Sequence, residues 1–226
     1  TVSFGGVVKH YWNFGDGSNI DSVNISPTHT YATPGNYNVS LSVLAADSCT
    51  AVYNRLIIVG SKPVANFAIL DSCQNKTLRF SDSSFAAVGT VNKWFWQFDN
   101  SQTSTLQNPM QLFTGYGNKN IKLAVTSAQG CVSDTLYKNI YVNAQPLANF
   151  NFSDSVCLGS PTIFTSSSTL ADGSLTNFSW TYSDSSGLLN SGFNVNHLFT
   201  QSGPQQTSLQ VSAAVGCQSE IISKPI

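Results

Sequence analysis

A tryptophan followed two residues later by an aromatic residue occurs three times in the 226-residue chain, and this repetition constrains the fold more than any other feature. The three copies lie at successive intervals of 84 residues: Trp12-Asn13-Phe14, Trp96-Gln97-Phe98 and Trp180-Thr181-Tyr182. Cys73 likewise recurs as Cys157 after 84 residues. Because a fixed internal period is the signature of tandem structural units, the sequence predicts three repeated domains.

Each repeat contains a segment in which apolar and polar residues alternate. In residues 36–43 the apolar side chains fall on one face and the polar ones on the other. Residues 120–125 and 207–211 follow the same pattern, with Leu209 and Val211 directed inward in the third copy. A period of two is typical of a strand that is buried on one side. With turn-forming residues between such segments and about seven short strands per repeat, the sequence predicts an all-β chain of immunoglobulin-like sandwiches.

The composition excludes two classes of partner. Charged residues make up only 9% of the chain, against a usual share of about 25%. The 10 Lys and Arg residues are scattered and the net charge is −1, so nothing predicts a nucleic-acid partner. No apolar run approaches the roughly 18 residues that a membrane-spanning helix needs, and no membrane insertion of this segment is expected.

The first repeat resembles the PKD (polycystic-kidney-disease) domain family. The resemblance is carried by three motifs: Tyr11-Trp12-Asn13-Phe14-Gly15-Asp16-Gly17, His29-Thr30-Tyr31 and Gly35-Asn36-Tyr37-Asn38-Val39. The second repeat has Phe98-Asp99-Asn100-Ser101 and Gln111-Leu112-Phe113 at the first two of these positions, and the third keeps His197-Leu198-Phe199. The resemblance implies three tandem immunoglobulin-like β-sandwich domains.

Tandem repeats with few charges and a Gly-Cys pair before the last strand, as at Gly130-Cys131 and Gly216-Cys217, are similar to those of large exported surface proteins. The nearest resemblance is to the SprB-type gliding adhesins of bacteria that use type IX secretion. It implies an extracellular location at the cell surface and a role in adhesion or gliding motility.

The spacing within the repeats predicts the domain boundaries. Phe80 precedes Trp96 by 16 residues, whereas Phe4 precedes Trp12 by only 8. Repeat 1 is therefore expected to lack its N-terminal strand, and the last strand of repeat 3 is expected to be cut short, as in a piece of a longer protein. The predicted domains are residues 1–60, 61–143 and 144–226, joined by short linkers that contain proline.

The five cysteines are distributed one, two and two over the repeats. This arrangement predicts disulfides within domains, Cys73 with Cys131 and Cys157 with Cys217, and leaves Cys49 unpaired. The alternative is that all five are buried free thiols in a reducing compartment. No Cys-x-x-Cys motif is present, so a zinc or redox site is not favoured.

Three further features have a structural and a functional interpretation. Asp16, between two glycines, is predicted to cap a turn, because no Asp-x-Asp-x-Asp loop favours calcium. The three repeated tryptophans are predicted to lie in the cores. Phe95 alternates out of phase with Trp94 and Trp96 and is therefore the candidate exposed contact residue.

No catalytic motif accompanies the three histidines, so no enzyme activity, metal or cofactor is predicted. Two functions stay open. The first is a non-catalytic spacer and adhesion segment whose partners are the neighbouring repeats of the same chain. The second is an accessory module of a secreted hydrolase that binds polysaccharide or matrix protein.

Overall fold

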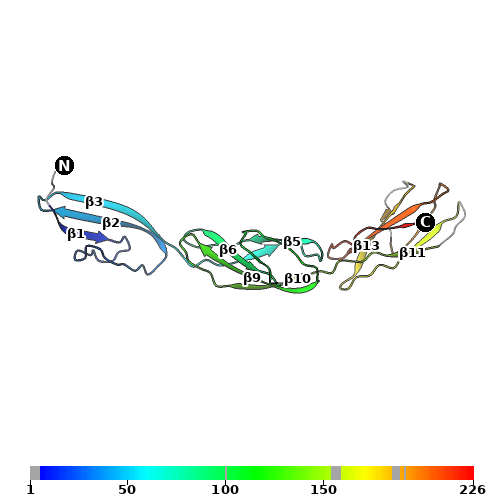
Figure 1. The fold of residues 1–226 in the computed structure, drawn as a ribbon, viewed down its shortest axis with the longest axis horizontal. Coiled ribbons are helices and arrows are strands. Elements are labelled where there is room, and N and C mark those ends of the chain that lie inside the picture. Colours follow the sequence, from blue (N-terminus) through cyan, green and yellow to red (C-terminus); the bar gives the residue numbers. More distant parts are fainter. Residues whose placement is uncertain (1–5, 100, 154–158, 185–188, 191) are drawn as a thin grey trace. The chain divides into compact units, whose positions relative to one another are not determined.

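The computed structural model describes residues 6–99, 101–153, 159–184, 189–190 and 192–226, and all regular secondary structure in them is β-strand (Figure 1). This confirms the all-β prediction. By their internal contacts the residues form two compact units. Unit 1 comprises Thr1–Ala68, Asp82–Gln107 and Ile121–Lys138, and unit 2 comprises Ile69–Ser81, Asn108–Asn120 and Asn139–Ile226. The second repeat therefore contributes residues to both units.

Repeat 1 forms one antiparallel sheet in the order β1-β2-β3. Its strands are β1 (Val7–Asn13), β2 (Gly35–Ala45) and β3 (Thr50–Val59). Strand β2 contains the alternating segment of residues 36–43 and extends beyond it at both ends. In β1, Trp12 lies opposite Leu41 of β2.

Repeat 2 contains two sheets, with the strand orders β4-β5-β8 and β10-β9-β6-β7. Trp96 in β6 is fully buried, its indole N–H donates to the carbonyl of Leu106 at 2.9 Å, and Phe67 meets its ring edge-on. The strands are β4 (Phe67–Ile69), β5 (Thr77–Asp82), β6 (Val91–Gln97), β7 (Thr103–Ser104), β8 (Met110–Leu112), β9 (Gly117–Ser127) and β10 (Leu136–Val142).

Repeat 3 is a sandwich of two sheets with the orders β11-β12-β15 and β14-β13-β16-β17. Trp180 of one sheet packs against Phe150 and Phe164 of the other, and the predicted inward residues Leu209 and Val211 are fully buried. The strands are β11 (Phe150–Phe152), β12 (Thr162–Ser166), β13 (Leu175–Tyr182), β14 (Leu189–Asn190), β15 (Asn194–His197), β16 (Gln206–Ala213) and β17 (Ile222–Pro225).

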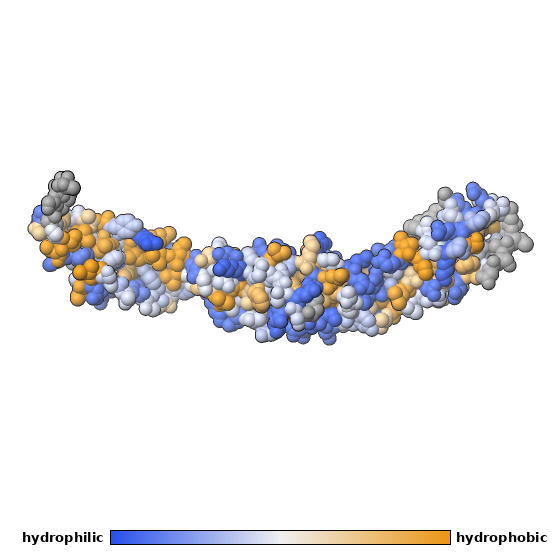
Figure 2. Space-filling model, viewed as in Figure 1, coloured by the Kyte–Doolittle hydropathy of each residue, from blue (hydrophilic) through white to orange (hydrophobic). Residues whose placement is uncertain are grey.

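The inner face of the repeat 1 sheet is less buried than its counterparts. Leu41 and Val43 are half-buried, whereas the corresponding Leu123 and Val125 of repeat 2 are 0% and 1% exposed. Trp12 is also half-buried, so the prediction of a core tryptophan holds for repeats 2 and 3 but not fully for repeat 1. The reason is that the described part of repeat 1 supplies only one sheet. Figure 2 accordingly shows hydrophobic residues over the region where β2 and β3 run.

Among the described residues there is no helix of the length and apolar character that crossing a membrane requires.

The hydroxyl of Tyr182 gives a stability prediction. The residue is 4% exposed and its hydroxyl is buried without a hydrogen-bond partner; burial, and then the charge of Asp184, raise its pKa to about 12. Repeats 1 and 2 have Phe14 and Phe98 at this position. Removing an unsatisfied buried polar group removes its desolvation cost, so Tyr182→Phe should raise the free energy of unfolding by about 1 kcal/mol in urea denaturation.

The control is Tyr137→Phe, because the Tyr137 side chain is 64% exposed and should change stability by less than about 0.5 kcal/mol. A loss of stability in Tyr182→Phe larger than in this control would show that the buried hydroxyl is satisfied in solution.

Candidate functional site

A disulfide between Cys73 and Cys217 joins repeat 2 to repeat 3 within unit 2, with a Cα–Cα distance of 5.6 Å. Cys73 precedes β5 and pairs in parallel with Asn143, the residue after β10, so it lies where the chain leaves repeat 2. Cys217 lies in the turn after β16, where its carbonyl accepts a hydrogen bond from the Ala213 N–H. The two cysteines are therefore held at the junction of the repeats by backbone pairing on each side.

The predicted pairings within domains are wrong. Cys73 is bonded to Cys217, and Cys131 and Cys49 are free thiols. Cys157 lies outside the described residues, and Cys217 is already bonded, so the predicted Cys157–Cys217 bridge does not form in this structure. Cys49 was predicted to be unpaired, and it is exposed.

The geometry of repeat 3 gives the physical reason. The first residue of β12, Thr162, pairs with His197, which stacks on Tyr182, and Tyr182 pairs with Thr207 near the start of β16. The turn of Cys217 follows the other end of β16. At about 3.3 Å per residue, the strand between these ends is about 20 Å long, whereas a disulfide needs Cα atoms within about 7 Å. The entry to β12 and the turn after β16 thus lie at opposite ends of one sandwich.

Polar contacts in unit 2 surround the disulfide, and Gln145 makes most of them. Its backbone N–H donates to the Gln74 side chain at 3.2 Å, and its side-chain oxygen accepts from Asn75 at 2.9 Å. Its side-chain nitrogen donates to the Gln218 carbonyl and to a Glu220 carboxylate oxygen, both at 3.2 Å. Gln145 therefore bridges the loop before β5 and the turn after β16, the same two segments that the disulfide joins.

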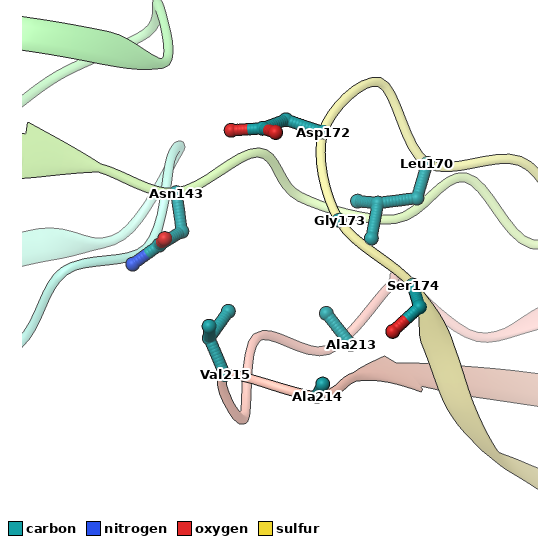
Figure 3. Close-up of a pocket in the computed structure, with 8 residues that line it drawn as sticks. All are labelled: Asn143, Leu170, Asp172, Gly173, Ser174, Ala213, Ala214 and Val215. Atoms are coloured by element: carbon teal, nitrogen blue, oxygen red, sulfur yellow. The ribbon is translucent and has the colours of Figure 1, made fainter.

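A hollow of about 250 Å³ lies beside this junction in unit 2. Figure 3 shows the loop of Asp172 on one side of it and the turn of Val215 on the other, with Asn143 at its edge. The Tyr141 hydroxyl donates to the Asp172 carboxylate, and this bond raises the pKa of Tyr141. The junction is therefore not closely packed at this hollow.

The stabilisation that the disulfide gives follows from the loop that the bond closes. The two cysteines are 144 residues apart. In the chain-entropy model a loop of this length lowers the entropy of the unfolded chain enough to stabilise the folded one by about 5 kcal/mol. Exposed polar pairs such as those of Gln145 are each worth at most about 1 kcal/mol.

The Asp16 turn is a structural clasp, as its predicted turn role requires. Its carboxylate accepts hydrogen bonds from the Ser18 N–H at 3.1 Å and the Ser18 hydroxyl at 2.6 Å, and lies 2.7 Å from His29 Nε2. The His29 ring stacks on Phe14 with centroids 3.9 Å apart. Gly15 adopts φ +77°, and a Cβ there would meet the Asn38 carbonyl at 2.7 Å. The turn thus requires both its glycine and its carboxylate.

The histidine partner of Asp16 was not predicted from the sequence. In repeat 3 the same clasp recurs, with Asp184 and His197 2.8 Å apart and the His197 ring stacked on Tyr182. The aligned positions of repeat 2 are Asn100 and Gln111 in the sequence. The joint replacement of the acid and the imidazole by two amides was the signal that could have revealed the pair.

This clasp gives a pH prediction. The hydrogen bonds from Ser18, and then the one to His29, hold the pKa of Asp16 far below its ordinary value of 3.8. A lowered folded-state pKa contributes stability that is present above the unfolded pKa and is lost as pH falls below it. The thermal stability of repeat 1 should therefore decrease from about pH 4 downward, and Asp16→Asn should flatten this dependence in calorimetry.

The matched variant is Asp134→Asn. Because the Asp134 side chain is 90% exposed, this substitution should leave the decrease of thermal stability below about pH 4 unchanged. If thermal stability fell as steeply at low pH in Asp16→Asn as in the wild type, the pH dependence would not come from Asp16.

Phe95 is 52% exposed and lies at an open hollow of about 570 Å³ in unit 1. The hollow is also lined by Lys93, Trp94 and Val132. The indole N–H of Trp94 donates to the carboxylate of Asp82 at 2.8 Å, which fixes that ring. An exposed phenyl ring at a hollow that an apolar side chain also lines can stack on a flat apolar ligand surface.

Within the described ranges no group of three or more His, Cys, Asp or Glu side chains is arranged to hold a metal ion. The described part of the chain thus offers two candidate sites, the covalent junction of unit 2 and the Phe95 hollow of unit 1.

Comparison with known proteins places the repeats. The family described as PKD domain matches residues 2–56, 60–142 and 143–224. Pre-pro-metalloprotease PrtV of Vibrio cholerae is 29% identical over 165 residues, which are 72% of this chain and 17% of the relative. A microbial collagenase of Vibrio alginolyticus is 39% identical over 57 residues, which are 25% of this chain and 7% of the relative. The chain thus spans less than a fifth of either relative.

Two solved structures are similar to single repeats. The PKD1 domain of the Vibrio cholerae metalloprotease PrtV is 30% identical, with a TM-score of 0.33 over 36% of this chain and 96% of that chain. The PKD1 domain of Vibrio anguillarum Epp is 25% identical, with a TM-score of 0.35 over 38% of this chain and 98% of that chain.

Proposed function

Because the chain belongs to the PKD domain family, we propose that it is a non-catalytic extracellular spacer whose covalently joined repeats carry load along a larger bacterial surface protein. The observation that carries this proposal is the disulfide between Cys73 and Cys217. Disulfides of this kind persist in oxidising, extracellular compartments. The low share of charged residues and the many Ser, Thr and Asn residues also fit an exported protein.

The bond changes what a pulling force can extend. A force on the chain ends passes from residue 1 to Cys73, across the disulfide, and from Cys217 to residue 226. Residues 74–216 lie inside the closed loop and bear none of it. The core strands of repeat 3 and much of repeat 2 are thus shielded while the bond is intact.

Single-molecule pulling between handles at the two ends tests this role. The fully extended length of the oxidised chain should be shorter than that of the reduced chain by about 500 Å, the extended length of the enclosed residues at about 3.5 Å each. Cys73→Ser should give the long extension even under oxidising conditions, because it removes the bridge.

Cys49→Ser is the control, since Cys49 is a free thiol and its removal should leave the extension unchanged. Equal extended lengths before and after reduction would contradict the proposal that the disulfide limits extension.

A more specific proposal is that the spacer is displayed at the cell surface and serves in adhesion or gliding. It would place the spacer between the cell and an adhesive segment elsewhere in the protein. Antibodies against these repeats should then label intact source cells, and labelling only of the culture medium would favour a released protein.

The Phe95 hollow favours a second candidate function, a binding module of a secreted hydrolase. One relative is named as a collagenase and another as a metalloprotease. These names support this interpretation, because both describe enzymes that cleave proteins. The ligand would be a polysaccharide or a matrix protein that presents a flat apolar surface to Phe95.

Phe95→Ala should then weaken binding to polysaccharide in affinity electrophoresis, or to immobilised collagen, by about tenfold, because truncating a central aromatic contact costs more than about 1 kcal/mol. Phe85→Ala is the matched control, since Phe85 is 59% exposed but does not line the hollow. Equal binding by both variants and the wild type would leave the spacer as the function of this segment.

A further inference from the structure

Cys131 occupies the same turn in repeat 2 that Cys217 occupies in repeat 3. The Ser127 N–H donates to the Cys131 carbonyl at 2.9 Å, as the Ala213 N–H donates to the Cys217 carbonyl at 2.8 Å. The glycine before each cysteine has φ 86°. The two turns therefore share these backbone features and place the cysteine at one position relative to the preceding strand.

The next residues of the two turns also correspond. Ser133 accepts a hydrogen bond from the Val125 N–H at 3.0 Å, and Ser219 accepts one from the Val211 N–H at 3.0 Å. In both repeats the serine hydroxyl closes the turn onto the strand that precedes it. The backbone on both sides of the cysteine is thus held by the same contacts in both copies.

In unit 1, Cys131 faces the chain that arrives from repeat 1. Its sulfur lies 3.6 Å from the Gly60 carbonyl oxygen, and a Cβ built on Gly60 would lie 3.3 Å from that sulfur and 2.7 Å from Gln129. Gly60 is the counterpart of Asn143, because Phe67 corresponds to Phe150, 83 residues later. Gln145, two residues after Asn143, contacts the turn of Cys217. The turn of Cys131 thus meets the linker before its own repeat, as the turn of Cys217 does.

We propose that Cys131 is half of an inter-repeat disulfide site that takes a cysteine from the preceding repeat, at the position that Cys73 occupies in repeat 2. The bond already formed by Cys217 is the independent observation, because the equivalent residue in an equivalent turn is linked in this way. The register is one repeat forward: the cysteine before the second strand of a repeat bonds the cysteine in the last turn of the next repeat. The proposal does not depend on the load-carrying role, because it concerns only which thiols meet.

Bond formation requires two thiols to lose two protons and two electrons. With oxidised glutathione as oxidant, one thiolate attacks its disulfide and releases one glutathione, and the second thiolate then attacks the mixed disulfide and releases another. In the cell the disulfide of an extracytoplasmic thiol–disulfide oxidoreductase would accept the two electrons in the same way.

The test adds one repeat to the 226-residue chain. A second copy of residues 61–143 is inserted after residue 143, so that one Cys131 now follows a repeat that contains a Cys73. After refolding in a glutathione redox buffer, unreduced protein is digested and linked peptides are identified by mass spectrometry. A peptide joining Cys73 to Cys131 should appear, in addition to the peptide joining Cys73 to Cys217 that is expected from the wild-type chain.

Copy-specific variants assign the bond. Cys73→Ser in the first copy should abolish the Cys73–Cys131 peptide, whereas Cys73→Ser in the second copy should abolish only the Cys73–Cys217 peptide. Absence of the Cys73–Cys131 peptide, or its survival when the first Cys73 is replaced, would overturn the proposal.

If circular dichroism shows that this insertion does not fold, a copy of residues 144–226 inserted after residue 60 makes the same test. There Cys157 of the inserted copy takes the place of Cys73. The peptide joining Cys157 to Cys131 supports the register, and its absence from this folded chain overturns it.

Discussion

Burial of the repeated indole is the interaction on which each complete sandwich depends. Trp180 is fully buried against Phe150 and Phe164 of the facing sheet, and its N–H reaches the Gly192 carbonyl at 3.4 Å. An indole held on its faces and at its edge fixes the spacing and register of the strands around it. The turns that follow these strands are thereby fixed at the two ends of the sandwich. In repeat 1, where the described residues supply only one sheet, the indole N–H of Trp12 has no hydrogen-bond partner.

The strands and their inward faces could be predicted because that information is local. Alternation in residues 36–43 and 207–211 is set by which side chains face the core, and β2 and β16 contain these segments. The cysteine pairing could not be predicted in the same way, because it depends on which end of the sandwich each loop occupies. Proximity within one repeat favoured Cys73 with Cys131, whereas Cys73 is bonded to Cys217. The sequence did show that each Gly-Cys turn lies just before the last strand of its repeat, and this position could have indicated a bond between repeats.

Each candidate site likewise combines a feature that follows from local sequence with a contact between residues that are distant in sequence. The exposure of Phe95 follows from strand alternation, and the structure shows it 52% exposed. The hollow beside it needs Val132 from a turn that is 37 residues away in sequence, and no local pattern gives that proximity. The turn role of Asp16 was likewise predictable from its flanking glycines, but the imidazole of His29 reaches it across 13 residues of irregular chain.

Tandem repeats normally couple only through contacts with their neighbours. Here a bond that closes 144 residues exceeds the period of 84, so bonds repeated in that register would overlap. With a bond at Cys131 as well as at Cys73, the shortest covalent path through repeat 2 would run between these two cysteines. The load would then fall on residues 73–131, which contain β5 to β9 and the buried Trp96, and the rest of the repeat would be slack. Overlapping bonds would therefore direct force onto the part of the sandwich that the indole holds together.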